Sequence, residues 1–339
     1  MKRSSLVHGL LLGMSLTALA VPAAAAAAAK REPIIDMHLH AVFWVPNMVE
    51  PLSGLRAPAE QEALRKQTLE TLERYNIVKA VASGPHVEAY KAAAPDCIIA
   101  GLGVGSVLGG IIETDAAKLR KLIADKRYEA IAEFAPQYDG FAPNDSALEP
   151  YFAVAEELDI PLGIHVGLGP PGAPYIGFPK YRMALSNPLL LEDVLVKHPK
   201  LRLYVMHAGW PMIDQTLGLL YAHPQVYVDI AVINWVLPRA EFHTYLRRLV
   251  ESGFGKRIMY GSDQMMWPEA IGRSIEAVES ANFLSAERKR DILYNNAARF
   301  LRLPGAKWDM ERARPTVERK RPNKSLQPAP SVSEYRGLP

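Results

Sequence analysis

The sequence lacks the features that define several common protein classes. Cys97 is its only cysteine, so the chain cannot form an internal disulfide, and we expect Cys97 to be a small buried apolar side chain. After the first thirty residues no apolar run reaches the about 20 residues that span a bilayer. The glycines of GLGVGSVLGG, residues 101–110, do not have the spacing of a dinucleotide-binding loop. These absences exclude a disulfide scaffold and argue against an open, doubly wound sheet.

The first 29 residues have the order of a secretory signal peptide. Lys2 and Arg3 precede an apolar run from Leu10 to Val21, and the alanines Ala23 to Ala29 follow it. The alternative is an uncleaved membrane anchor, but the run is shorter than the about 20 residues of a bilayer span. We therefore expect cleavage of this segment, export of the chain to the periplasm, and no membrane contact after cleavage.

Charge is distributed unevenly along the chain. The formal net charge is +3, yet residues 30–304 alone sum to −3. Lys2 and Arg3 contribute +2, and residues 305–339 contribute +4 through eight Lys or Arg and four Asp or Glu. A body with this charge is not expected to bind nucleic acid. The basic tail also contains five prolines, and we expect it to be disordered, with binding to nucleic acid or to an anionic surface as the alternative.

Between Ile34 and Leu303 short apolar runs alternate with amphipathic stretches. The runs are rich in Val and Ile and mostly lack polar alternation, which is typical of strands that are covered on both faces. We expect strands near residues 34–40, 77–84, 97–104, 128–134, 160–167, 201–209, 226–232 and 257–263. We expect helices over residues 60–75, 85–94, 114–125, 147–158, 188–197, 212–222, 241–251, 269–280 and 285–300.

Eight strand–helix units over roughly 270 residues match the size of a (β/α)₈ barrel. The pattern therefore predicts an α/β TIM barrel that forms a single domain over residues 30–304. Two connections are longer than a bare barrel needs, residues 41–59 after the first strand and residues 167–187 after the fifth. Both would lie at the C-terminal ends of the strands, where the active sites of such barrels form.

Side chains that bind metals recur at the ends of these predicted strands. They are His38 and His40 in the first strand, Glu133 in the fourth, His165 in the fifth, His207 in the sixth and Asp263 in the eighth. His38 and His40 are two residues apart, so in a strand they point to the same face. Alone, the pair could equally be two ordinary polar side chains. Because the other four also lie at strand ends, which converge on one mouth of a barrel, the set predicts a divalent metal site.

Several motifs in the body resemble those of the amidohydrolase-related, metal-dependent TIM-barrel hydrolases. They are IIDMHLH, IHVG, MHAGWP, YGSD and DILYNNAARFL, within residues 33–303. They are most similar to the branch that contains the aminocarboxymuconate semialdehyde decarboxylases. The resemblance implies that His38, His40 and His165 bind metal, that Asp263 binds metal or accepts a proton from its water, and that His207 acts as a base or polariser.

Glu133 departs from the pattern of binuclear family members, many of which bridge their ions with a carboxylated lysine from the fourth strand. YEAIAEF, residues 128–134, contains no lysine. Glu133 could bridge two ions, bind one, or accept a hydrogen bond from a ligand histidine. From the ligand types we expect one or two zinc ions, with manganese, iron or cobalt as alternatives.

The predicted function is that of an exported metal-dependent hydrolase that acts on a C–N or C–O bond at the carbonyl carbon of a small amide, ester or lactone. One alternative is non-oxidative decarboxylation of a planar carboxylic acid, and another is a non-catalytic metal- or ligand-binding protein. The candidate substrate contacts are Arg182, Trp44, Trp210, Trp235 and Trp267, with loop packing as the alternative role for each. Family habit suggests a homodimer.

Overall fold

The computed structural model describes residues 31–42, 44–108 and 112–304. The expected signal peptide and basic tail lie outside the described residues. Among the described residues, no helix combines the length and apolar character that a membrane crossing requires.

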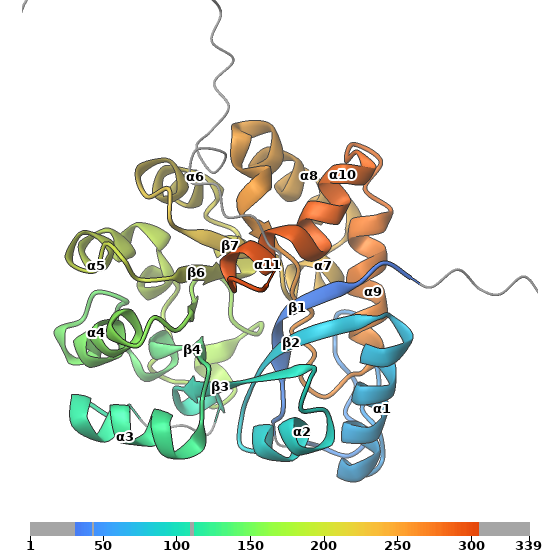
Figure 1. Cartoon of the computed structure of the whole chain (residues 1–339). Helices are drawn as coiled ribbons and strands as arrows, with labels where there is room; N and C mark the ends of the chain where they lie inside the picture. Colours follow the sequence, from blue (N-terminus) through green and yellow to red (C-terminus); the bar gives the residue numbers. More distant parts are fainter. Residues whose placement is uncertain (1–30, 43, 109–111, 305–339) are drawn as a thin grey trace, which may run out of the picture. The chain divides into compact units, whose positions relative to one another are not determined.

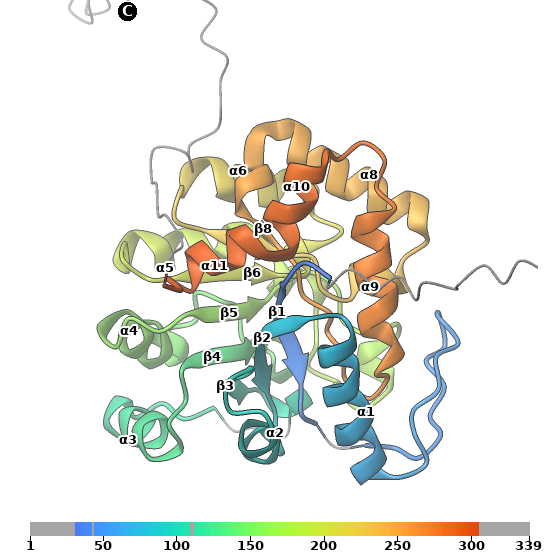
Figure 2. The same ribbon diagram turned by 45° about the vertical axis from the view of Figure 1, so that its right-hand side comes forward.

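Eight parallel strands form one sheet whose spatial order is their order in the sequence. The strands are β1 (Ile34–His40), β2 (Ile77–Ser83), β3 (Ile98–Val104), β4 (Ala130–Phe134), β5 (Leu162–His165), β6 (Leu203–Met206), β7 (Tyr227–Asp229) and β8 (Ile258–Met259). Figure 1 and Figure 2 show the strands at the centre of the body with helices around them. This arrangement confirms the predicted TIM barrel.

The barrel closes where β1 meets the segment that follows β8. Met37 N donates to Tyr260 O at 3.0 Å, Asp263 N donates to His38 O at 2.7 Å, and His40 N donates to Gln264 O at 3.1 Å. These bonds place the first-strand histidines directly beside Asp263, although more than 200 positions separate them in the sequence.

Helices follow the strands and cover the outside of the sheet. They are α1 (Gln61–Arg74), α2 (Val87–Ala93), α3 (Ala116–Lys126), α4 (Glu149–Glu157), α5 (Glu192–Lys197), α6 (Ile213–Ala222), α7 (Ile233–Val236), α8 (Arg239–Leu249), α9 (Glu269–Glu279), α10 (Ala286–Arg290) and α11 (Asn296–Phe300). Side-chain caps stabilise the N-termini of two helices. The Asp115 carboxylate accepts from two backbone N–H groups of α3, and the Ser285 hydroxyl accepts from Arg288 N of α10.

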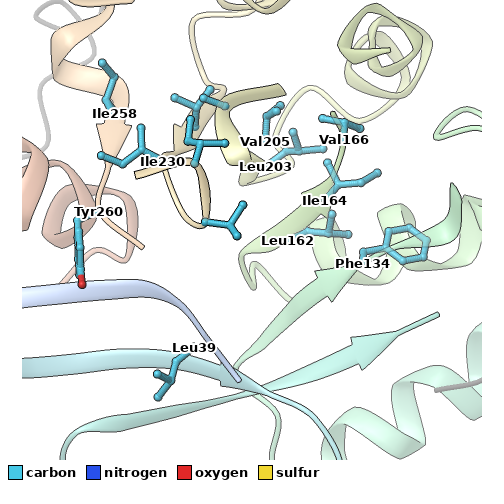
Figure 3. Close-up of a cluster of buried hydrophobic side chains, with 14 of the residues drawn as sticks. Leu39, Phe134, Leu162, Ile164, Val166, Leu203, Val205, Ile230, Ile258 and Tyr260 are labelled. Atoms are coloured by element: carbon cyan, nitrogen blue, oxygen red, sulfur yellow. The ribbon is translucent and has the colours of Figure 1, made fainter. Parts of the chain in front are cut away.

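Two layers of apolar side chains fill the body. The outer layer lies between the strands and the helices, and Figure 3 shows part of it, including Leu162, Ile164 and Val166 of the β5 region. The inner layer fills the barrel and includes Met37, Tyr204 and Phe300. Because a strand alternates its side chains between the two layers, membership of a layer shows which way each strand residue points.

Inside the barrel Gly163 makes room for the Tyr204 ring, whose hydroxyl donates to Met37 O at 3.1 Å. A Cβ at residue 163 would lie 2.3 Å from Tyr204 Cζ. In contrast, a Cβ at Gly218 in α6 would meet its nearest neighbour outside the helix, Leu189 Cδ2, at 3.6 Å, which is ordinary contact.

We therefore predict opposite effects for two glycine-to-alanine substitutions. Gly163→Ala should lower the free energy of unfolding by about 1–3 kcal/mol through overpacking. Gly218→Ala should raise it by up to about 1 kcal/mol, because alanine favours the helix. Urea denaturation measures both. Equal effects of the two variants would contradict the described packing of the barrel interior.

Candidate metal centre

A register shift in β1 turns the two first-strand histidines into the barrel. Between Asp36 and Leu39, β1 contains one residue more than the paired segment of β2. Met37 therefore belongs to the inner layer and Leu39 to the outer one, which leaves His38 and His40 on the inner side. Their ring centroids lie 5.0 Å apart, so the prediction that they share a face is confirmed.

A register shift in β4 likewise turns Glu133 inward. This strand has one extra residue between Ile131 and Phe134 relative to both neighbouring strands. Ala132 points into the barrel and Phe134 packs in the outer layer, and Glu133 lies beside the first-strand histidines. Such bulges redirect side chains near active sites.

His207 and Asp263 follow their strands instead of ending them, and both have a left-handed backbone. Their φ angles are 56° and 49°. Residues other than glycine adopt this conformation at a cost of about 1–3 kcal/mol, and such residues cluster at functional sites. His165 points into the barrel without a bulge or a left-handed residue, because it continues the regular alternation of β5 after the inward Gly163.

The six predicted side chains converge at the C-terminal ends of the strands, and all six are buried. His38 Nε2 lies 3.1 Å from His40 Nε2. His40 Nε2 lies 2.8 Å from Asp263 Oδ1 and 3.4 Å from Glu133 Oε2. On the other side, His165 Nδ1 contacts Glu133 Oε1 and lies 3.3 Å from His207 Nε2.

Hydrogen bonds on the outer ring atoms determine where the imidazole protons lie. His38 Nδ1 is 3.2 Å from Asp229 Oδ2, His207 Nδ1 is 3.0 Å from Ala231 O, and His165 Nε2 is 2.7 Å from Leu168 O. Because carboxylate and carbonyl oxygens only accept, each of these nitrogens is the donor. When one of these rings is neutral, its second nitrogen carries the lone pair, and that nitrogen faces the common centre.

This donor set fits a divalent metal ion. Three overlapping groups each place their ligand atoms within 4.8 Å of one another: His38 with His207 and Asp263, His38 with His40 and Glu133, and Glu133 with His165 and His207. Asp263 Oδ1 faces two of these imidazoles, with His40 Nε2 at 2.8 Å and His38 Nε2 at 3.6 Å. Neutral imidazole and carboxylate are the ligands of catalytic zinc and of related ions.

The pKa values in the absence of an ion show the same excess of negative charge. Burial by itself would lower the pKa of His38, but the Asp263 and Asp229 carboxylates outweigh burial and hold it well above its usual value. Burial would likewise raise the pKa of Glu133, yet His165 brings it well below its usual range. Protons therefore occupy positions that a metal cation would take.

His207 differs from the other histidines of the centre. Burial, followed by repulsion from His165, lowers the pKa of His207 to about 4. With its Nδ1 proton donated to Ala231 O, the neutral ring presents only an acceptor to the centre. His207 is therefore arranged as a base or a ligand. In this tautomer Nε2 accepts a hydrogen bond, and the role of His207 as base or polariser stays a prediction.

Two buried aspartates beside the centre were missed by the sequence interpretation. Asp229 on β7 accepts from the His38 ring, and Asp36 on β1 accepts from His38 N and Ser262 N at 3.0 and 2.9 Å. A signal was available for Asp229, because a lone carboxylate in the apolar run VYVDIAV requires a buried partner.

The side chains that we expected to contact the substrate make hydrogen bonds within the protein. Trp235 and Trp267 are buried, and their indole N–H groups donate to Ser262 O and Met48 O at 2.7 and 3.0 Å. The half-buried Trp44 and Trp210 donate to Pro58 O and Glu241 Oε1. Arg182 is exposed and donates to two carbonyls of its own loop, those of Pro179 and Tyr181. These contacts favour the loop-packing alternative. They do not prevent the face of a tryptophan ring from contacting a substrate.

Comparison with known proteins identifies the family of the chain. The amidohydrolase family model matches residues 35–303. The chain belongs to the amidohydrolase family. It is therefore an enzyme of this family, and the narrower resemblance to the aminocarboxymuconate semialdehyde decarboxylase branch stays a prediction. A curated relative of this amidohydrolase, protein fluG of Emericella nidulans, is 21% identical over 158 residues, which are 42% of this chain and 17% of that protein.

Solved structures of similar fold include both hydrolases and decarboxylases. A probable 2-pyrone-4,6-dicarboxylic acid hydrolase from Acinetobacter baumannii is 17% identical, with a TM-score of 0.56 over 79% of this chain and 98% of that one. The 2,6-dihydroxybenzoate decarboxylase from Rhizobium is 13% identical, with a TM-score of 0.54 over 81% and 99% of the two chains. At these identities the likeness shows the fold alone.

We predict that Trp235→Phe affects stability more than substrate binding. The change leaves the buried Ser262 carbonyl without its donor, which should cost about 1–3 kcal/mol of unfolding free energy. Trp210→Phe is the control, and it should cost less because water can replace the indole as donor to Glu241. Denaturation and KM measurements test this. A raised KM with unchanged stability would show that Trp235 contacts substrate.

Proposed function

We propose that this amidohydrolase hydrolyses a C–N or C–O bond at the carbonyl carbon of a small amide, ester or lactone, with the help of a divalent metal ion. The observation that carries the proposal is the convergence of imidazole nitrogens with two carboxylates in a buried mouth. A divalent ion bound there would polarise the carbonyl and lower the pKa of water from about 15.7 to near 7.

The metal ligands that we propose are His38, His40, His165 and Asp263, together with Glu133. The mixed imidazole and carboxylate set makes zinc our first choice, with manganese, iron or cobalt as alternatives. Each oxygen of Glu133 faces a different part of the centre: Oε2 lies 3.4 Å from His40 Nε2, and Oε1 contacts His165 Nδ1. This geometry supports Glu133 as a ligand shared by two ions.

The protein groups can accept the protons that hydrolysis releases. Asp263 Oδ1 lies inside the centre, 2.8 Å from His40 Nε2, and as a carboxylate oxygen it can take a proton from attacking water and pass it to the leaving group. His207 Nε2 faces the same centre as a second acceptor. Neither group needs to move in order to accept.

The orientation of His207 also favours hydrolysis over decarboxylation. Non-oxidative decarboxylation replaces a carboxylate with a proton at carbon, so it needs a proton donor next to the substrate. His207 gives its proton to Ala231 O and presents a lone pair instead. Decarboxylation of a planar acid remains the second candidate, because the fold resembles that of a dihydroxybenzoate decarboxylase.

Two further proposals rest on sequence and family habit. We propose that the chain is exported to the periplasm, since residues 1–29 have the order of a signal peptide. We also propose that it acts as a homodimer on a small molecule. Size-exclusion chromatography with light scattering and fractionation of cells measure these two properties.

Asp263→Asn should lower kcat by about 10²–10⁴-fold, because the amide cannot accept the proton that the carboxylate accepts. Rates are measured with a panel of esters, lactones and amides. Asp193→Asn on the outer face of α5 is the control, since Asp193 is exposed and, within the described part of the chain, accepts a hydrogen bond from Asn144 alone, and its rates should not change. Unchanged turnover and metal content in Asp263→Asn would contradict the mechanism. Carbon dioxide release from aromatic acids, without hydrolysis of the panel, would favour the decarboxylase.

The purified protein should contain close to two divalent ions per chain, and Glu133→Ala should lower that number to one or fewer. The expected loss follows from removing a carboxylate whose two oxygens face two sets of histidines. Elemental analysis by mass spectrometry measures the ratio. A ratio near one in the unchanged protein would contradict a bridging Glu133 and leave it as a ligand of one ion or a hydrogen-bond acceptor.

A further inference from the structure

We propose that Asp229 is a positioning residue that fixes the proton of His38 on Nδ1 and at the same time holds the backbone of His207. The proposal rests on the proposed metal-dependent function. It concerns a residue outside the six predicted members of the centre, and it gives one carboxylate control over two of them.

The first half of the argument is the contact with His38. Asp229 is fully buried on β7, and its Oδ2 lies 3.2 Å from His38 Nδ1. A neutral imidazole has one N–H, and a carboxylate can only accept. In the neutral ring the proton is therefore on Nδ1, and the lone pair is on Nε2, which lies 3.1 Å from His40 Nε2 in the centre. Carboxylate partners of this kind orient metal-binding histidines and make them more basic.

The second half is the contact with the backbone of His207. Asp229 Oδ1 accepts from His207 N at 2.9 Å and from Ala231 N at 3.0 Å. His207 has a φ of 56°, a conformation that a side chain makes costly. A charge-assisted hydrogen bond in a buried site offsets part of that cost. One carboxylate thus connects β1, β6 and β7 at the point where the imidazoles converge.

A purely structural role is the competing explanation, and Asp36 provides the comparison for it. Asp36 is also fully buried, and its Oδ1 also accepts from two backbone N–H groups, those of His38 and Ser262. None of its hydrogen bonds goes to an imidazole nitrogen, and its Oδ2 has no partner among the described residues. The two aspartates therefore differ chiefly in the contact between Asp229 and the His38 ring.

The experiment compares Asp229→Asn with Asp36→Asn. Each asparagine keeps one oxygen for the two backbone N–H groups, so both folds should persist with similar losses of stability. Only Asp229→Asn places an NH₂ group in front of His38 Nδ1, which would move the ring proton to Nε2, inside the centre. We expect zinc affinity to fall by about 10–100-fold in Asp229→Asn and to stay close to that of the unchanged protein in Asp36→Asn. Competition with a chromophoric chelator measures it.

A second measurement shows directly which ring nitrogen of His38 carries the proton. Nitrogen-15 labelling of histidine, with His38 assigned through a His38→Asn variant, shows which ring nitrogen carries hydrogen in the zinc-loaded and zinc-free protein. We expect an Nδ1–H signal for His38 that Asp229→Asn removes and Asp36→Asn retains. An Nε2–H tautomer in the unchanged, zinc-free protein at a pH where His38 is neutral would overturn the proposal, even if Asp229→Asn fails to fold.

The outcomes separate this proposal from the proposed function. Equal zinc affinities in the two variants, with the His38 Nδ1–H signal retained in both, would overturn the role of Asp229 and leave metal-dependent hydrolysis intact. If the unchanged protein binds no divalent ion, the proposed function fails, while the Nδ1–H signal still decides whether Asp229 positions the ring.

Discussion

Two buried carboxylates and several imidazole nitrogens without protons cannot remain close together unless positive charge lies between them. Removing a charged group from water is costly unless it is paired, and Glu133 and Asp263 have no Lys or Arg partner among the described residues. Without an ion, protons supply that charge, as the raised pKa of His38 shows. A divalent cation would supply this positive charge in one place. The surrounding residues can therefore be interpreted as groups that hold the metal ligands in position.

The fold provides this support through its closing seam and its irregularities. The bonds between β1 and the segment after β8 bring His38 and His40 next to Asp263. Register shifts turn His38 and His40 of β1 and Glu133 of β4 inward. Left-handed backbone conformations occur at His207 after β6 and at Asp263 after β8. Each irregularity weakens local pairing or adds strain, so their concentration around one mouth is consistent with a function there.

Most of the architecture could be predicted from sequence, because covered parallel strands produce continuous apolar runs and each run here is followed by an amphipathic helix. The members of the site could also be predicted, since metal-binding side chains recur at strand ends. Their directions could not. Simple alternation from the inward Ala130 and Ala132 would point Glu133 outward, and the extra residue that reverses it is visible only in the pairing with β3 and β5.

The tryptophans show a second limit of the sequence. Trp235 and Trp267 occupy site-facing positions along the chain, yet both are buried with their N–H groups bound to backbone carbonyls. Their hydrogen-bond partners come from distant loops, which no local pattern encodes. Asp229 was overlooked for a related reason, because its partners lie on β1 and β6. Contacts between strands far apart in sequence therefore carry the part of the site that residue spacing misses.

Anomalous diffraction at the zinc absorption edge, from crystals of the zinc-loaded protein, tests the central claim most directly. The account predicts an anomalous peak among His38, His40, Glu133 and Asp263, at about 2.0–2.1 Å from His38 Nε2, the usual zinc–imidazole distance. A map that shows zinc only at the surface, with the six side chains bonded to one another, would contradict it.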